Sequence, residues 1–214
     1  LRKESDITTG IEHRPQQASR LLRHLQKQGA SVTLKSDHWD EALIESTIAR
    51  GPHKSAHEYA EFLREEMTDF VKKGYWIVLP YKALRNQRKQ FKLLRVNPMG
   101  VVPQRARRPR LIVDYSFLDL NRDTVKLAPQ EAMQFGHALH RILHSIVDSD
   151  PQYGPVKLIK VDIADGFYRI WLNLDHIPKL AVAIPSLKGE EPLLALPLVL
   201  PMGWTESPPY FCAA

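Results

Sequence analysis

The chain contains a single cysteine, Cys212, among its 214 residues, which excludes an internal disulfide bond. It also lacks a long apolar run: the longest stretch, Leu193 to Leu200, is interrupted by Pro197 and is too short to span a membrane. The N-terminus is polar and basic, without the apolar core of a secretory signal. From these absences we expect an intracellular protein, cytoplasmic or nuclear, that has no membrane partner.

Acidic residues are missing from one part of the chain. Between Lys82 and Arg110 there are ten Lys or Arg and no Asp or Glu; subtracting these ten charges from the net +6 leaves −4 for the remainder. A segregated basic block of this kind is typical of a surface that binds a polyanion. Tyr81 and Phe91 lie among the charges, where their rings can stack on bases. The block predicts binding of RNA or DNA, with a solvated basic hairpin as the alternative.

Helices and strands are predicted in irregular order, without the regular alternation of a parallel α/β protein, and this indicates an α+β fold. Residues 1–51 carry two short helical patterns: one ends at Gly29, and the other begins after a cap at Asp37 and ends at Gly51. We interpret residues 1–51 as a helical appendage or linker.

A stronger helix follows this segment. Ser55 and Glu58 form a capping box, and an apolar stripe then runs from Tyr59 to Val71 before Gly74 ends the helix. Three short strands are predicted after it, at residues 75–79, 101–102 and 111–113. A charged hairpin tip at residues 104–109 joins the last two.

A second helix is predicted over residues 132–146, opened by Pro129. Three histidines share one face of this helix: His137, His140 and His144. They suggest a zinc site, but no nearby cysteine or carboxylate completes a ligand set. A solvated helix face is therefore favoured. Two further strands are predicted at residues 158–163 and 180–184.

The predicted strand at residues 158–163 carries a candidate metal ligand. Because side chains alternate along a strand, Lys160 and Asp162 share one face. A carboxylate at a strand end beside an open turn suits Mg²⁺, which prefers oxygen ligands and retains waters or substrate phosphates. Two such ions can hold the attacking 3′-hydroxyl and the leaving pyrophosphate during nucleotidyl transfer. An Asp-x-x-Asp pattern is also common in ordinary turns, which is the alternative for Asp162 and Asp165.

This segment resembles the first palm motif of reverse transcriptases, a strand ending in Asp that leads to a small residue and two aromatics. The matching positions are Asp162, Ile163, Asp165, Gly166, Phe167 and Tyr168. The resemblance implies that Asp162 and the Ile163 carbonyl bind metal and that Asp165 and Gly166 lie beside the triphosphate. It also implies that Phe167 leaves no room for a sugar 2′-hydroxyl; from the residues alone, Phe167 is interpreted as a core aromatic.

Residues 200–211 resemble the second palm motif of the same family, Leu-Pro-x-Gly-x-x-x-Ser-Pro-x-x-Phe. The resemblance places Met202 near the incoming nucleotide. It also places three residues near the template and primer: Gly203, Trp204 and Ser207. A structural turn with a buried tryptophan is the alternative.

Residues 110–115 resemble the fingers strand of reverse transcriptases. The resemblance implies that Arg110 grips the triphosphate, and a planar guanidinium suits phosphate oxygens well. Three arginines on the predicted hairpin tip are further candidates for template or primer contact: Arg105, Arg107 and Arg108.

The resemblance implies the fingers of a right-hand polymerase and an incomplete palm. Residues 52–125 correspond to fingers, and residues 126–214 to a partial palm with a fingers insertion near residues 175–205. The sequence has no aromatic-x-Asp-Asp hairpin to supply the other metal-binding carboxylates. We therefore expect a piece of a longer polyprotein, which would supply the remaining palm, a thumb and an RNase H domain if one is attached.

The implied function is that of an RNA-directed DNA polymerase fragment, inactive alone, which uses two Mg²⁺ ions, a dNTP and a primed RNA or DNA template. The alternative is a non-catalytic basic remnant of a retroelement that binds nucleic acid. A third, more distant hypothesis is a Mg²⁺-dependent phosphohydrolase that uses Asp162.

Overall fold

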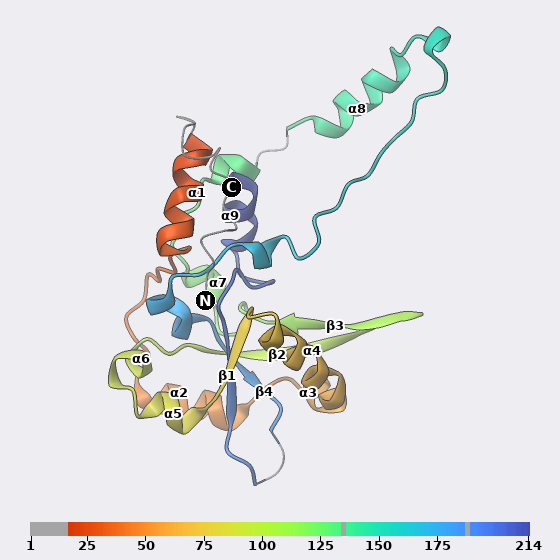
Figure 1. The fold of residues 1–214 in the computed structure, drawn as a ribbon. Helices are drawn as coiled ribbons and strands as arrows, with labels where there is room; N and C mark the ends of the chain where they lie inside the picture. Colours follow the sequence, from red (N-terminus) through yellow and green to blue (C-terminus); the bar gives the residue numbers. More distant parts are fainter. Residues whose placement is uncertain (1–16, 134–135, 187–188) are drawn as a thin grey trace.

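One mixed sheet organises the computed structural model, which describes residues 17–133, 136–186 and 189–214 (Figure 1). The strand order is β1-β5-β4-β2-β3; β2 and β4 are parallel, and the other neighbours are antiparallel. The strands are β1 (Trp76–Pro80), β2 (Val96–Gln104), β3 (Arg107–Val113), β4 (Ala181–Ile184) and β5 (Leu193–Pro197). The predicted α+β class is confirmed.

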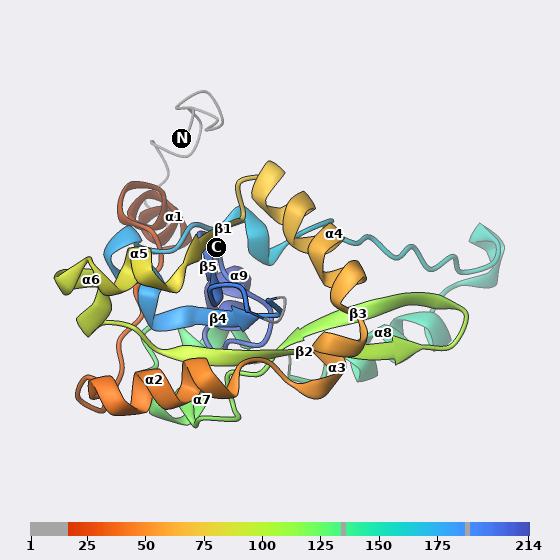
Figure 2. The same ribbon diagram turned by 90° about the horizontal axis from the view of Figure 1, so that it is seen from below.

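Strand β2 belongs to two parts of the molecule. Residues 96–98 pair with β4 inside the buried sheet, whereas the pairing with β3 runs from Met99 to Gln104. The first six residues of β2 are buried and the last three are exposed, so the β2–β3 hairpin extends beyond the sheet (Figure 2). Pro98 lies where the pairing changes, and its carbonyl accepts a hydrogen bond from the Asp114 amide at 3.0 Å.

Most of the helices lie around this sheet and contribute apolar side chains to its core. They are α1 (Gln17–Gln28), α2 (Glu41–Arg50), α3 (Lys54–Glu58), α4 (Ala60–Lys72), α5 (Tyr81–Arg85), α6 (Arg88–Lys92), α7 (Leu120–Asp123), α8 (Ala138–Val147) and α9 (Ser207–Ala213). Short 3₁₀ segments are η3 (Gln130–Met133), η4 (Pro151–Tyr153), η5 (Phe167–Arg169) and η6 (Leu174–Leu180). Trp76 and Trp204 are among the largest fully buried side chains of the core.

The N-terminal helices join the same core. Helix α1 ends before Gly29 as predicted, and Leu25 and Ile44 are buried in the main apolar cluster. The predicted cap at Asp37 is wrong: Asp40 caps α2, because its Oδ1 accepts a hydrogen bond from the Leu43 amide at 2.7 Å. The part of residues 1–51 that the structure describes therefore contributes to the main apolar cluster, with α2 against β2 and α1 beside α9 (Figure 1).

The predicted capping box is also wrong. Helix α3 begins at Lys54, one residue before Ser55, and Tyr59 interrupts the helix before α4. The Ser55 hydroxyl accepts a hydrogen bond from the Val101 amide of β2 at 3.1 Å. Ser55 therefore ties α3 to the hairpin, and this tertiary contact replaces the local cap.

The predicted strand at residues 158–163 does not form. The backbone is extended there, but no backbone hydrogen bond joins it to another described residue. Its apolar side chains face solvent, with Ile159 87% and Val161 83% exposed. The helix predicted over residues 132–146 forms only as α8 from Ala138 onward; its residues 134–135 lie outside the described residues. Helix α8 also buries none of its residues, and it projects from the sheet together with this segment (Figure 1). Alternation of side chains predicts extended backbone, whereas a strand also requires a partner.

We expect Gly29→Ala to lower the free energy of unfolding by about 1–3 kcal/mol more than Gly74→Ala, the cost typical of overpacking. Both glycines are left-handed, with φ of 75° and 73°. An added Cβ at Gly29 would lie 2.4 Å from the carbonyl carbon and oxygen of Leu172, whereas at Gly74 it would meet nothing within 4 Å. Denaturant unfolding of both variants measures the difference. Equal losses would contradict the contact between Gly29 and Leu172.

Candidate functional site

Two of the predicted motifs meet at the side chain of Phe211 on α9. The Phe167 and Phe211 rings pack edge to face with centroids 5.4 Å apart. Gly166 lies directly beside the same ring, since a Cβ there would be 2.9 Å from Phe211 Cζ. The lack of a side chain at Gly166 therefore permits the close approach of the turn that carries Asp165 to the helix that follows Gly203.

A second contact joins the Gly203 turn to the end of β3. Gly203 has φ of 96°, and a Cβ there would lie 2.6 Å from the Val113 carbonyl oxygen. Asn121 bridges the turn: its Nδ2 donates to the Gly203 carbonyl at 2.9 Å, and its Oδ1 accepts from the Thr205 amide at 2.9 Å. These contacts hold together three segments that are distant in sequence: residues 110–121, 165–168 and 203–211. We call them the polymerase cluster.

Arg110 is exposed on β3 and shares a face of the strand with Arg108. Arg108 is already engaged by helix α4, with Nη2 2.6 Å from Glu66 Oε1 and its guanidinium 5.3 Å from the centre of the Phe62 ring. Arg110 forms no ion pair with a described carboxylate. Of the two arginines on this face, Arg110 is the one available to a ligand.

Tyr168 is affected by charges from two of the predicted motifs. Burial raises the pKa of Tyr168 to about 12, the charge of Asp165 acts in the same direction, and the charge of Arg110 opposes both. Asp165 has a left-handed φ of 53°, and its Oδ2 is 4.0 Å from the Lys73 ammonium. The charges of the predicted phosphate-binding residues Arg110 and Asp165 therefore act on the same tyrosine.

Asp162 belongs to the unpaired segment that leads into the Asp165 turn, and it is exposed. Among residues 17–133, 136–186 and 189–214, no group of three or more His, Cys, Asp or Glu is arranged to hold a metal ion. Asp162 and the Ile163 carbonyl are the predicted ligands, and they supply too few oxygens for Mg²⁺ on their own. The described residues therefore do not fit a complete magnesium site.

The residues predicted to contact template and primer differ in accessibility. Trp204 is 1% exposed, and its indole Nε1 donates to Thr124 Oγ1 at 3.2 Å. Ser207 is fully buried, with its hydroxyl donating to the Pro201 carbonyl at 2.7 Å. Both side chains are buried and hydrogen-bonded within the protein. This arrangement agrees with the alternative prediction, a structural turn with a buried tryptophan. Met202, at 43% exposure, is the accessible side chain of this turn.

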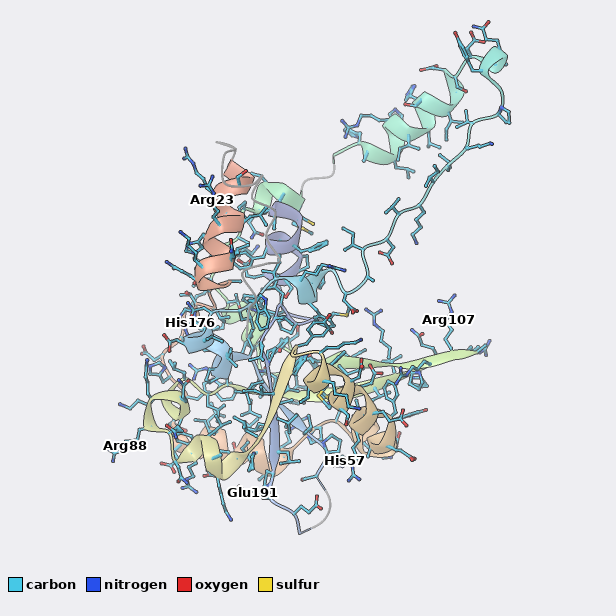
Figure 3. The ribbon with its side chains drawn as sticks, in the orientation of Figure 1. Arg23, His57, Arg88, Arg107, His176 and Glu191 are labelled. Atoms are coloured by element: carbon cyan, nitrogen blue, oxygen red, sulfur yellow. The ribbon has the colours of Figure 1, made fainter. Side chains whose placement is uncertain are left out.

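The basic block is divided by the fold. Arg88 on α6 and Arg107 at the hairpin tip lie at opposite ends of the sheet (Figure 3). Part of the block is neutralised by ion pairs: Arg85 with Glu41 at 2.7 Å and Lys89 with Asp175 at 3.3 Å. The hairpin keeps exposed charges at Arg105, Arg107 and Arg110.

Base stacking by Tyr81 and Phe91 is a wrong expectation. Tyr81 is 6% exposed, and its hydroxyl donates to Glu45 Oε1 at 2.8 Å. Phe91 packs against the Tyr81 ring with centroids 6.3 Å apart. Both rings serve the packing of α5 and α6 against α2.

The histidines of α8 do not complete a metal site within the described residues. The Nε2 atoms of His140 and His144 lie 3.0 Å apart on the exposed helix, and no third ligand joins them. The solvated face favoured from the sequence matches this arrangement.

Glu206 is a structurally important residue that the sequence motifs do not single out. It is 1% exposed; its Oε2 accepts from the amides of Leu127 and Ala128 at 2.7 and 2.8 Å, and its Oε1 accepts from Gln130 Nε2 at 3.1 Å. This carboxylate fixes the segment before η3 to the start of α9. An isolated Glu after a tryptophan turn carries no sequence signal for such a role.

Comparison with protein-family models and with curated proteins found no match to the chain. In the part of the chain that the structure describes, no helix combines the length and the apolar character required to cross a membrane.

Substitutions around Tyr168 test the cluster. Asp165→Asn should lower the pKa of Tyr168 from about 12, because it removes a negative charge that disfavours the phenolate, and Arg110→Gln should raise it. NMR titration of ring-labelled tyrosine measures both shifts. Tyr210 is the internal control, since burial and Glu206 raise its pKa to about 12 independently of this cluster. An unchanged Tyr168 in both variants would refute the proximity of the three groups.

Proposed function

We propose that the chain is the fingers and partial palm of an RNA-directed DNA polymerase, and that its described part binds primed template and dNTP. The observation that carries the proposal is the convergence of three segments, each of which resembles a reverse transcriptase motif. Residues 110–121, 165–168 and 203–211 are far apart in sequence. Independent chance matches would have no reason to be neighbours in the fold.

The chemistry of the cluster suits a triphosphate. Arg110 offers a planar guanidinium that can donate two parallel hydrogen bonds to phosphate oxygens. The turn at Asp165 and Gly166 packs against Phe211, and the Phe167 ring lies on the same Phe211 ring. Phe167 is thereby positioned rigidly enough to limit the space under a sugar, which is the role that the resemblance implies for it.

The extended hairpin suits a nucleic-acid backbone. Arg105 and Arg107 are exposed at its end, beyond the last buried residue of β2. Arginines on a projecting hairpin can follow phosphates without reading bases, so this contact is expected to be independent of sequence. Met202 is the exposed side chain nearest to Gly203 in the chain and is the proposed neighbour of the nucleotide.

Metal-dependent chemistry is a separate part of the proposal. Mg²⁺, when bound, would supply charge neutralisation for the triphosphate, and this chain would contribute Asp162 and the Ile163 carbonyl. An incomplete carboxylate set is expected of the polymerase fragment and of the alternative function, a binding module without catalysis. Both versions share the same nucleic-acid surface, so binding and catalysis need separate tests.

Binding is tested with a primer–template duplex and fluorescence anisotropy at several salt concentrations. Arg107→Gln and Arg110→Gln should each weaken binding and reduce the slope of log K against log salt by about 1, because each removes a phosphate contact. Arg88→Gln is the matched control, with the same loss of charge on α6 at the other end of the sheet. Equal effects of all three variants, or binding that does not depend on salt, would refute the hairpin surface.

Catalysis is tested by primer extension with Mg²⁺ and dNTPs. We expect no extension by the chain alone, because one strong carboxylate holds two metal ions poorly. Extension that is lost in Asp162→Asn would show that the chain completes its own site and would exclude the binding module. Release of inorganic phosphate without extension, abolished by Asp162→Ala, would instead support the phosphohydrolase hypothesis.

A further inference from the structure

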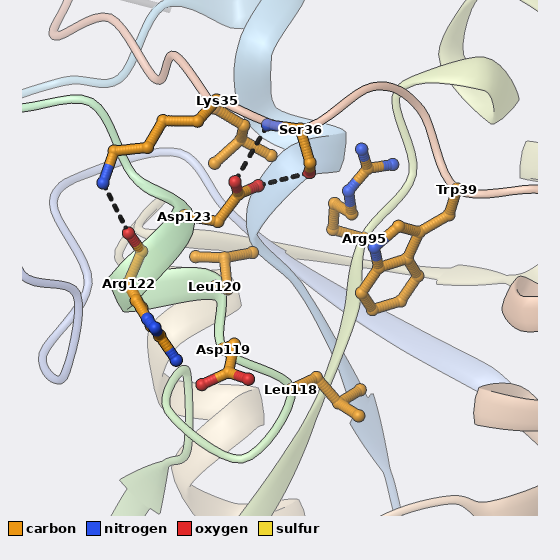
Figure 4. A pocket seen from close by; sticks show the side chains of 10 residues that line it. Lys35, Ser36, Trp39, Arg95, Leu118, Asp119, Leu120, Arg122 and Asp123 are labelled. Atoms are coloured by element: carbon orange, nitrogen blue, oxygen red, sulfur yellow. Dashed lines mark hydrogen bonds between the residues drawn. The ribbon is translucent and has the colours of Figure 1, made fainter.

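A cleft of about 420 Å³ lies between α7 and residues 34–39, which cross in front of the start of β2 (Figure 4). Hydrogen bonds fix this crossing segment to α7. The amide and hydroxyl of Ser36 donate to the two Asp123 carboxylate oxygens at 2.9 and 2.5 Å, and Lys35 Nζ donates to the Arg122 carbonyl at 2.8 Å. The cleft is therefore preformed, and its volume lies within the usual range of small-molecule sites.

Arg95 lines this cleft and is a buried charge without a counter-ion. Its side chain is 2% exposed and forms no ion pair with a described carboxylate. Its Nη2 donates to the Asp37 carbonyl, and its Nη1 reaches the Leu94 carbonyl only at 3.5 Å. The buried Nε has no partner among the described residues. An unpaired buried guanidinium is costly, so a ligand that carries negative charge would offset a real energetic deficit.

The surroundings of Arg95 do not fully compensate the burial of its charge. Burial lowers the pKa of the Arg95 guanidinium, and the charge of Asp123 only partly opposes this. Burial also lowers the pKa of Lys179, and the charge of Arg95 adds to that effect. The two Asp123 carboxylate oxygens accept hydrogen bonds from Ser36 and form no ion pair with Arg95.

The walls of the cleft have different characters. Lys35 and Arg122 are exposed at its edge, and neither side chain forms an ion pair with a described residue. On the opposite wall the half-buried Trp39 indole lies against Arg95, with the guanidinium 5.1 Å from the ring centre (Figure 4). Asp119 adds one carboxylate, so three cations face two anions across the cleft.

We propose that this cleft is a binding site for a small oxyanion-bearing molecule, of the phosphate-ester or carboxylate class. The oxyanion lies at the exposed edge of the cleft beside Lys35 and Arg122, and the buried Arg95 adds positive potential from the interior. The apolar or planar part of the ligand extends toward Trp39. The site is formed by α7, the crossing segment and the start of β2. Part of its lining, residues 118–120, belongs to the segment 110–121, but none of the proposed ligand contacts is a residue assigned to the polymerase. The two proposals are therefore tested by different substitutions.

The test uses the whole chain, with inorganic phosphate and a nucleoside monophosphate as probes at constant ionic strength. Trp39 fluorescence reports binding, and Trp39→Phe identifies its signal among the four tryptophans. We expect saturable binding with a Kd of about 1 mM or tighter. The monophosphate should bind more tightly than phosphate, because it adds contact with Trp39; the unphosphorylated nucleoside should not bind measurably.

Substitutions separate the site from general attraction to a basic protein. Lys35→Gln and Arg122→Gln should each weaken binding about tenfold, whereas Arg107→Gln on the distant hairpin should have no effect. Arg95 is buried, and its substitution is expected to disturb folding. The exposed residues Lys35 and Arg122 are therefore the ones substituted. The proposal is overturned if neither probe saturates, if the nucleoside binds as well as its monophosphate, or if all three variants weaken binding equally.

Discussion

The rest of the structure depends on the double role of strand β2. Its first residues pair in parallel with β4 inside the core, and the continuation pairs with β3 outside it. Because one backbone serves both, the exposed hairpin has the rigidity of the buried sheet. Pro98 has no amide hydrogen to donate and lies at the change of partners, while a register shift between Val102 and Gln104 accompanies the exposed end.

This strand also determines what can gather around it. The end of β3 returns to the core beside Gly203, and only a residue without a side chain fits against the Val113 carbonyl. Asn121 and Glu206 then hold the Gly203 turn and the start of α9 in place. The Phe211 ring on that helix packs against Gly166 and the Phe167 ring. The candidate site is thus a consequence of packing at two glycines, with Arg110 carried to it by the hairpin.

Several elements are predictable from the sequence because their signals are local. Helix α4 has a clear apolar stripe and the hairpin has apolar ends around a charged tip, and both form. The full length of β2 is not predictable in this way, since Pro98 and Gly100 obscure a strand that tertiary pairing stabilises. The opposite error occurs at residues 158–163, where a strong alternation has no partner strand. The buried Arg95 is equally hidden, because a lone arginine within a basic block gives no sign of burial.

Arg110 and Asp162 differ in how firmly the structure holds them, and this difference ranks the two parts of the proposed function, phosphate binding and metal-dependent catalysis. A group that binds metal for catalysis must be held within about 0.5 Å of its working position, by neighbours that lock its backbone and side chain. The Arg110 backbone is fixed by pairing with Val102 of β2, and the Phe167 ring packs on the Phe211 ring. Asp162 does not meet the requirement for a metal ligand, because its backbone has no hydrogen-bonded neighbour among the described residues. The proposed binding of phosphates therefore rests on a strand whose backbone is paired, whereas the proposed chemistry at Asp162 is conditional on residues 158–163 gaining a strand partner that fixes the carboxylate.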